Sequence, residues 1–382
     1  MTRIGELAEI ARVVMGQSPP GGSVNRCGHG VPLLNGPTEF TEHHPVPVQW
    51  TESPTKLALS GDTLFCVRGS TTGRMNIADQ RYCIGRGIAA IRAWDTADAS
   101  FVFFALLHAL PGLLSGVTGS VFPNLSSSQI AKAQIRIPAA TQRRAIAEVL
   151  GAFDDKIAAN ERLRVASRDL RAALLKGSLA QASESVSLAE STILLVRGKA
   201  PKYSTGESGV LVINQKCVRD GVVSVEPARL SEVTREPLLR TGDTLVNSTG
   251  QGTLGRVGVW REDTTAFADS HLTILRFNPT RLSPWVGAEA VIAAEAQIEA
   301  MGEGSTGQTE LSRKSLSEFA IVVPAAEAQG PLGQRLAVLH QREHQAVLES
   351  RQLRNMRDTL LPHLMSGRIS VREAAKAVEE VL

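Results

Sequence analysis

Two glycine-rich turns hold most of the side chains in this sequence that could bind a ligand. One turn follows Gly61-Asp62-Thr63-Leu64, and the other follows Gly242-Asp243-Thr244-Leu245. Guanidinium, hydroxyl and amide groups gather in both turns, and such groups bond the phosphates and base edges of nucleic acids. They belong to Arg68, Ser70, Thr71, Thr72 and Arg74 in the first turn and to Asn247, Ser248, Thr249, Gln251, Thr253 and Arg256 in the second. The alternative is an ordinary solvated hairpin, because Gly, Ser and Thr are common in any loop.

A second pair of polar segments precedes the last predicted strand of each half of the chain. The first segment covers residues 119–124 and the second covers residues 305–309. Their candidate contact residues are Ser120, Asn124, Thr306 and Gln308. Gln17, Arg86 and His271 are weaker candidates of the same chemical kinds.

The sequence contains no motif for catalysis or metal binding. A Walker phosphate loop, a His-Glu-x-x-His helix, a Gly-x-Ser-x-Gly elbow and an Asn/Asp-Pro-Pro-Tyr methyltransferase motif are all absent. Residues 250–255 have the glycine spacing of a dinucleotide site, but Val257 and Val259 continue a strand where that site needs a helix. The adjacent His43 and His44 lack nearby Cys or Asp partners and indicate surface residues. We therefore predict no catalytic residues and no metal site.

Two long helices are predicted to position these turns. Apolar residues recur at alternating three- and four-residue steps from Pro138 to about Gln181, which is typical of a helix that packs along one face. Thr141 is the expected N-cap and Gly177 the expected stop. A second stripe of this kind covers residues 331–361. The residues expected to leave apolar surface for partners beside the stripes are Ala152, Leu175, Val347 and Leu348.

The second half of the chain repeats the first at an offset of about 180 residues. The matched segments are Gly30–Asn35 with Gly209–Asn214, Leu59–Leu64 with Arg240–Leu245, and Ile135–Pro138 with Ile321–Pro324. The three matches occur in the same order, and each copy ends in a long amphipathic helix. Duplication of a domain with its helix explains this order better than coincidence.

The predicted fold class is α+β. Short apolar runs between clusters of Gly, Pro, Ser and Thr indicate two mixed, β-rich domains over residues 1–138 and 183–325. A central long helix over 139–182 separates them, with Ser183–Ser187 as a polar linker, and a second long helix with a short helical tail covers 326–382. If the two helices pair as an antiparallel coiled coil, the two domains form a pseudo-twofold repeat.

The composition permits nucleic-acid binding without demanding it. The 382 residues are 43% hydrophobic and carry a formal net charge of +3, far short of a histone-like balance. The four cysteines form no Cys-x-x-Cys pair, which disfavours a disulfide framework and fits a reducing cytoplasm. The N-terminus lacks an apolar signal region and no apolar run reaches membrane-spanning length. We therefore expect a soluble, cytoplasmic protein.

Several segments together resemble the specificity subunits of type I restriction-modification systems. They are Gly61–Leu64 with Arg68–Ser70, Gly242–Leu245 with Asn247 and Ser248, Ile135–Pro138 leading to Gln142–Ala147, Val149–Ile157, and Arg357–Pro362 with Leu364–Gly367. The run 149–157 resembles the opening of that family's central helix, and the last pair resembles its closing segment. The resemblance covers nearly the whole chain. One departure is that the second helix begins with residues 330–334 and lacks the Asp-Asp-Lys run of the first.

The resemblance implies a DNA-reading scaffold with no chemistry of its own. Each of two target recognition domains would read one half of a split sequence in double-stranded DNA. The helices would hold two modification subunits that bind S-adenosylmethionine and methylate adenine, and restriction subunits that use ATP and Mg²⁺ can join them to cut DNA. This chain would bind no cofactor itself. The runner-up is a coiled-coil interaction scaffold that never meets DNA, and the third alternative is a self-contained enzyme.

Overall fold

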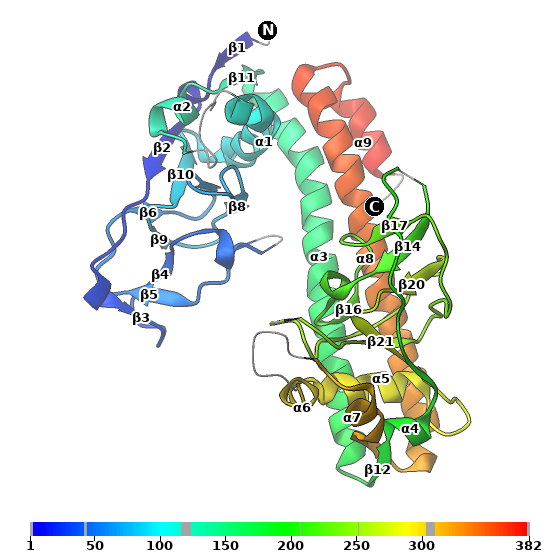
Figure 1. The fold of residues 1–382 in the computed structure, drawn as a ribbon. Coiled ribbons are helices and arrows are strands. Elements are labelled where there is room, and N and C mark those ends of the chain that lie inside the picture. The colour runs from blue at the N-terminus through cyan, green and yellow to red at the C-terminus, as the bar shows by residue number, and fades with distance from the viewer. Residues whose placement is uncertain are drawn as a thin grey trace. The chain divides into compact units, whose positions relative to one another are not determined.

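The chain divides into two compact units (Figure 1). The computed structural model describes residues 3–41, 44–115, 124–206, 208–250, 252–302 and 310–379. The first unit consists of residues 1–162 and 347–382, and the second consists of residues 163–346. Each unit therefore holds one β-rich domain together with part of each long helix.

The first unit contains two small sheets and a two-stranded ribbon. The sheets have the strand orders β2-β10-β7-β8 and β3-β5-β4-β9-β6, and β1 pairs with β11 in the ribbon. The strands are β1 Arg3–Glu6, β2 Ala11–Met15, β3 Val24–Asn25, β4 Val31–Leu34, β5 Gln49–Thr51, β6 Leu57–Ala58, β7 Thr63–Cys66, β8 Met75–Ile77, β9 Tyr82–Ile84, β10 Ile88–Ala93 and β11 Gln134–Ile137. The helices α1 (Ala99–Ser115) and α2 (Ser127–Ala131) complete this domain.

The second unit has a similar set of sheets. Their orders are β13-β21-β18-β19-β16-β15 and β17-β14-β20, and β12 pairs with β22 in a ribbon. The strands are β12 Ser183–Ser187, β13 Thr192–Arg197, β14 Val210–Ile213, β15 Val218–Arg219, β16 Gly221–Val223, β17 Arg229–Ser231, β18 Thr244–Asn247, β19 Val257–Val259, β20 Ala266–Ala268, β21 Leu272–Phe277 and β22 Ala320–Pro324. The short helices are α4 Leu188–Ser191, α5 Pro284–Ala293, α6 Glu295–Ala300 and α7 Arg313–Glu318.

The two domains share several strand pairings, which confirms the internal repeat. In the first domain β10 pairs antiparallel with both β2 and β7, as β21 does with β13 and β18 in the second. The parallel pair β4–β9 is matched by β14–β20, and the ribbon β1–β11 is matched by β12–β22. Equivalent strands therefore end in equivalent turns.

Both predicted long helices are present, with different ends from those expected. Helix α3 spans Ala140–Leu179, so Thr141 lies inside the helix and is not its N-cap, and the helix continues through Gly177. Helix α8 spans Ala326–Ser366 and is longer than the predicted stripe over 331–361. Pro331 lies inside α8 beyond its first turn, so the helix lacks one main-chain donor there. The expected terminal helix is α9, Val371–Glu379.

Within each unit the two long helices pair antiparallel. In the first unit Arg357 of α8 donates to Asp154 of α3, and Asn160 Nδ2 of α3 donates to Glu349 Oε2 of α8 at 2.8 Å. Residue numbers thus rise along α3 while those of the contacts on α8 fall. This order is the one expected of an antiparallel coiled coil.

The segment Ser183–Ser187 is a strand and not the predicted linker. It forms β12, which pairs antiparallel with β22 over its whole length. Ser187 then begins α4, because its Oγ accepts a hydrogen bond from Glu190 N–H at 3.2 Å. The sequence pattern hid this strand because its pairing depends on main-chain hydrogen bonds, which polar side chains allow equally well.

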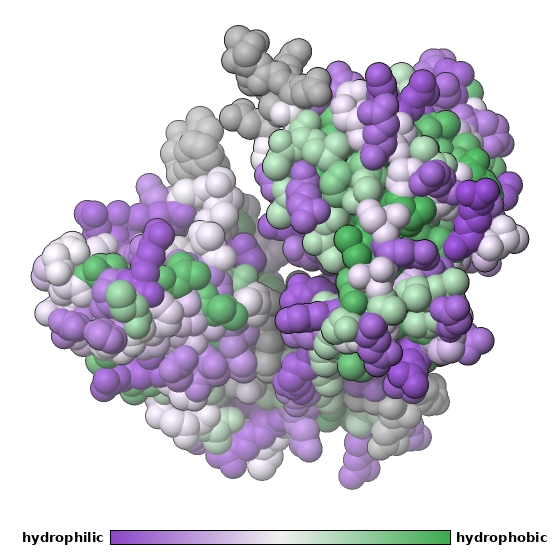
Figure 2. All heavy atoms as spheres, turned by 90° about the horizontal axis from the view of Figure 1, so that it is seen from below, coloured by the Kyte–Doolittle hydropathy of each residue, from purple (hydrophilic) through white to green (hydrophobic). Residues whose placement is uncertain are grey.

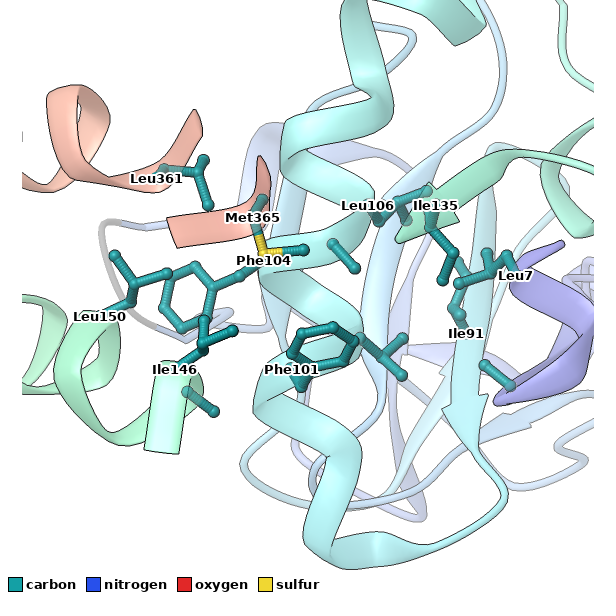
Figure 3. Packing of buried hydrophobic residues seen from close by; sticks show 14 of the residues in the cluster. Leu7, Ile91, Phe101, Phe104, Leu106, Ile135, Ile146, Leu150, Leu361 and Met365 are labelled. Atoms are coloured by element: carbon teal, nitrogen blue, oxygen red, sulfur yellow. The ribbon is translucent and has the colours of Figure 1, made fainter. Parts of the chain in front are cut away.

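The core of the first unit joins its domain to both long helices. Figure 3 shows Phe104 of α1 beside Ile146 and Leu150 of α3 and Met365 of α8. All four side chains are buried. Burial of each such side chain contributes roughly 1.5–3 kcal/mol relative to an exposed one. The helices are therefore part of the domain core and not a detached support.

Within the part of the chain that the structure describes, one helix is long and apolar enough to cross a membrane by length and composition. It covers Thr96–Ser115, with a mean hydropathy of 1.6, so the expectation that no run reaches this length was wrong. A single such helix is weak evidence for a membrane span, because core helices pass the same test. Phe101 and Phe104 of this helix pack in the domain core. Figure 2 shows polar residues over much of the visible face, with apolar residues gathered between them.

Candidate nucleic-acid interface

Three segments of the first domain meet where adjoining strands end. Gln17 N–H, just after β2, donates to Ile84 O at 2.9 Å, and Val67 N–H, just after β7, donates to Gly87 O at 2.9 Å. We call residues 16–17, 68–74 and 85–87 the first turn cluster. Because main-chain hydrogen bonds hold the three segments, their side chains project from a well-ordered backbone.

The second domain has the same arrangement. Lys199 N–H donates to Ala268 O at 2.9 Å, and Ser248 N–H donates to His271 O at 2.9 Å. We call residues 198–199, 249–250, 252–256 and 269–271 the second turn cluster. The matching hydrogen bonds make Lys199 the equivalent of Gln17, and His271 the equivalent of Gly87.

An equivalent main-chain hydrogen bond closes each of the two glycine-rich turns. Cys66 N–H donates to Arg74 O at 2.9 Å in the first domain, and Asn247 N–H donates to Arg256 O at 2.8 Å in the second. Cys66 is therefore the equivalent of Asn247, and Arg74 is the equivalent of Arg256. Each arginine is the last residue of its turn.

Asn247 and Ser248 belong to the domain interior and not to the exposed turn. Both are 0% exposed. Asn247 Nδ2 donates to Gln215 O at 3.0 Å, and Ser248 Oγ lies 2.6 Å from Thr273 Oγ1. Sequence alone suggested contact residues here because both are polar, but Asn247 occupies the buried position of Cys66. We therefore remove Asn247 and Ser248 from the candidate contacts.

The first turn offers four exposed polar side chains, and three of them make no hydrogen bond to the described residues that would hold them in the turn. Arg68, Ser70 and Thr71 are exposed. Thr72 is half-buried, and its Oγ1 donates to a main-chain oxygen of the same turn at 2.8 Å. Arg74 is exposed, but its Nη2 donates to a main-chain oxygen at 3.0 Å. Arg68, Ser70 and Thr71 are thus the stronger candidates of the five.

The candidates of the second turn are half-buried and linked to one another. Thr249 Oγ1 lies 2.6 Å from His271 Nδ1, which joins two of the three segments of the second turn cluster. Thr253 Oγ1 makes long hydrogen bonds within the turn, including one of 3.3 Å to Gly250 O. Arg256 Nη2 donates to a main-chain oxygen of the turn at 2.8 Å. This turn therefore presents groups whose directions are set by neighbours.

The second pair of polar segments is only partly described. Asn124 is exposed and lies beside the first turn cluster, since the N–H of Leu125 donates to Val67 O at 3.0 Å. The candidates that lie outside the described residues are Ser120, Gln251, Thr306 and Gln308. Their role stays a prediction.

Close backbone approach explains a glycine in each turn cluster. A Cβ on Gly16 would lie 2.1 Å from Gly85 O, and a Cβ on Gly198 would lie 2.1 Å from Asp269 O. Any side chain at these positions would force the neighbouring strand end away. The close approach that glycine allows fixes the position of the next residue, Gln17 or Lys199, beside the turn.

Lys199 is the residue that sequence reasoning missed. It is exposed, and it is held like Gln17 by a main-chain hydrogen bond to the end of a neighbouring strand. The available signal was a Gly-x pair, Gly16-Gln17 and Gly198-Lys199, at nearly the repeat offset. Two residues are too short a match to stand out without the strand pairing.

The chemistry of the clusters is that of binding by charge and hydrogen bonds. Burial raises the pKa of Cys66 to about 12 and that of Cys217 to about 11, so these thiols are protonated and poor nucleophiles. Among the residues that the structure describes, no group of three or more His, Cys, Asp or Glu side chains could hold a metal ion. Exposed Arg, Lys, Ser and Thr groups are the ones that contact DNA phosphates and bases.

Comparison with known proteins agrees with these features. Residues 3–166 match the model of the type I restriction modification DNA specificity domain. A putative type I restriction enzyme specificity subunit of Methanocaldococcus jannaschii is 35% identical over 173 residues, which cover 44% of this chain. The chain matches only 40% of that relative's length.

A solved structure has the same fold over nearly the full length. It is the S subunit of a type I restriction-modification system from M. genitalium, with a TM-score of 0.62 and 17% sequence identity over 96% of each chain. At this identity the likeness shows the fold alone. The family model over residues 3–166 and the curated relative over 173 residues supply the sequence relationship, and each covers less than half of this chain.

Proposed function

We propose that this chain reads a two-part sequence in double-stranded DNA, one half with each turn cluster. The observation that carries the proposal is that one backbone arrangement occurs twice and presents different side chains each time. Gln17 and Gly87 in the first cluster correspond to Lys199 and His271 in the second. Two copies of one frame with different side chains suit a target whose halves differ in sequence.

The exposed groups divide into phosphate and base candidates. Arg68 and Arg86 in the first cluster and Lys199 in the second carry charges that phosphates attract, and such contacts position a protein on DNA. Gln17 has an amide that can bond N6 and N7 of adenine at once on its major-groove edge. Hydroxyl and imidazole groups in the second cluster can reach base edges in the same way.

The long helices would serve as the platform for two methyltransferase subunits. Large apolar side chains are exposed on α3 at Leu163, Val165 and Leu170, which are 41%, 41% and 48% exposed. Val338 of α8 is 50% exposed. Leu175, expected on this surface, is only 3% exposed and packs in the core of the second unit. Apolar surface of this kind supports a protein partner.

Catalysis would then belong to the partners. We propose that the methyltransferase subunits bind S-adenosylmethionine, that restriction subunits bind ATP and Mg²⁺ where they are present, and that this chain binds none of these. The assembly would work in the cytoplasm, where chromosomal DNA is accessible. The absence of catalytic motifs from the sequence supports this division.

Domain exchange combined with methylome sequencing tests the proposal. The chain is expressed with its methyltransferase partner in a host that lacks adenine methylation, and methylated positions are mapped. Replacing residues 188–324 with the matching domain of another family member should change one half of the motif and leave the other intact. Exchange of residues 3–137 should change the opposite half.

Three outcomes would contradict the proposal. A change in both halves after one exchange would refute one domain per half. Methylation without sequence preference would support a scaffold that never reads DNA. Methyl transfer by the purified chain alone would show that the chain is itself an enzyme.

A further inference from the structure

A hydrogen-bonded pair, Thr249 and His271, joins two segments of the second turn cluster. Thr249 Oγ1 lies 2.6 Å from His271 Nδ1. We propose that the two side chains act as one specificity-determining unit, in which Nδ1 is engaged by Thr249 and Nε2 is presented to a base edge. The inference rests on the proposed DNA-reading function and names residues of the second domain that would carry it.

The backbone of His271 is held on both sides. His271 N–H donates to Asp269 Oδ1 at 2.9 Å, and His271 O accepts from Ser248 N–H at 2.9 Å. Asp269 is itself 3% exposed, and its N–H donates to Ile213 O at 2.8 Å. The imidazole is exposed. An exposed ring on an anchored backbone has few directions in which to point, which lowers the entropy lost on binding.

The same position in the first domain cannot carry a side chain. Gly87 is the equivalent of His271, and a Cβ on Gly87 would lie 2.6 Å from Asn35 O. The first domain therefore presents only backbone where the second presents an imidazole. Because the surrounding main-chain hydrogen bonds match, the difference between the two domains at this position lies in the side chain.

The engaged nitrogen determines what the ring can offer DNA. In a neutral imidazole one ring nitrogen is a donor and the other an acceptor. If the Thr249 hydroxyl donates a hydrogen bond to Nδ1, Nε2 carries the ring hydrogen and points a donor outward. In the major groove, guanine, adenine and thymine present acceptors to such a donor, whereas cytosine presents an amino donor. The pair is thus expected to discriminate against cytosine at one position of its half-motif.

Two amide replacements separate the two roles of the ring. The amide of His271→Asn lies near the place of Nδ1, so it can keep the contact with Thr249 but has no outward donor. The amide of His271→Gln reaches the place of Nε2, so it can keep the outward donor but not the contact. Thr249→Val removes the hydroxyl with little change in shape. All three are assayed as the full complex with the methyltransferase partner by methylome sequencing.

The expected results are distinct for each variant. His271→Asn should admit cytosine at one position, with discrimination there reduced about tenfold, because the outward donor is lost. His271→Gln should keep the preferred base and methylate more slowly. Thr249→Val should weaken the same position as His271→Asn, because the ring loses its anchor.

The half-motif read by the first domain is the internal control. It should stay unchanged in every variant, which also shows that each variant folds and assembles. Arg219→Ala, an exposed change at the end of β15, is the matched surface control. An unchanged motif in both His271→Asn and Thr249→Val would overturn the inference while leaving the proposed function intact. If the wild-type complex shows no two-part motif, the proposed function itself fails.

Discussion

Arg276 holds Asp243 through two parallel hydrogen bonds inside the second domain. Nε donates to Oδ1 at 2.8 Å and Nη2 donates to Oδ2 at 2.7 Å. Arg92 holds Asp62 in the same way in the first domain, with distances of 2.9 and 2.7 Å. The aspartate of the repeated Gly-Asp-Thr-Leu segment is thus a structural clamp, placed just before the strand that leads into each glycine-rich turn.

Breaking this clamp should destabilise one domain and spare the other. In Asp243→Asn the side chain is isosteric but neutral, so the guanidinium of Arg276, 15% exposed, loses its counter-charge. We expect a loss of about 3 kcal/mol in the free energy of unfolding of the second unit. Hydrogen exchange should show faster exchange in β18 and β21 and unchanged rates in β7 and β10. Asp62→Asn is the matched control and should reverse the pattern; faster exchange in both domains would contradict it.

A buried charge cluster makes the second unit sensitive to acid. Arg171 of α3 lies 2.7 Å from Glu289 of α5 and 2.6 Å from Glu343 of α8, which also meets Arg261 at 2.8 Å. Two cations thus face two carboxylates. His340 Nε2 lies 2.9 Å from Glu289 Oε1, and the side chain is 0% exposed. Burial lowers the pKa of His340 to about 4, so the ring is neutral at pH 7.

The sign of the pH dependence follows from His340. Between its ordinary pKa of 6.5 and about 4, the unfolded chain binds a proton at this residue and the folded chain does not. The free energy of unfolding should therefore fall as the pH falls through this window, by on the order of 3 kcal/mol. Calorimetry from pH 7 to 4.5 measures the effect. His340→Gln should flatten the curve, and an equal slope in that variant would assign the dependence to other groups.

Arg68 is expected to contact DNA. It is exposed and projects from a turn whose backbone is held by hydrogen bonds. Arg68→Ala should weaken binding by the assembled complex and make the plot of log affinity against log salt shallower by about one unit if it meets a phosphate. A loss confined to the target sequence would instead indicate base contact. Arg81→Ala is the matched control, because Arg81 precedes β9 while residues 85–87 of the first turn cluster follow it. Equal effects of both changes would mean that the loss comes from the lower net charge and not from a contact of Arg68.

The long helices should set the spacing between the two half-motifs. The boundary between the units falls after Arg162 in α3 and after Ala346 in α8. Seven residues inserted at both places add about 10 Å of helix and preserve the packing face. At about 3.4 Å per base pair the gap should grow by about three base pairs, with both half-motifs unchanged. Insertion in α3 alone should impair pairing of the helices, and an unchanged gap in the active double variant would rule out this spacing role.

Local pattern in the sequence was enough to predict the two long helices, the repeat and the absence of catalytic motifs. Apolar residues spaced by three and four positions favour a helix wherever they occur, because that spacing places them on one face. Gly-Asp-Thr-Leu marked the equivalent strands of both domains because its aspartate accepts a hydrogen bond from the main-chain N–H three residues earlier in each copy. Strand β12 was not predicted, because its polar side chains give no indication of its main-chain pairing with β22.

Tertiary structure decided which polar residues face solvent and which neighbours they have. Asn247 and Thr249 are both polar residues near one turn, yet one fills the buried position of Cys66 and the other meets His271. Lys199 lies in the second turn cluster because its N–H donates to Ala268 O at the end of β20. These outcomes depend on contacts between residues far apart in the chain. The sequence determines which groups are present, whereas the pairing of strands determines which of them come together.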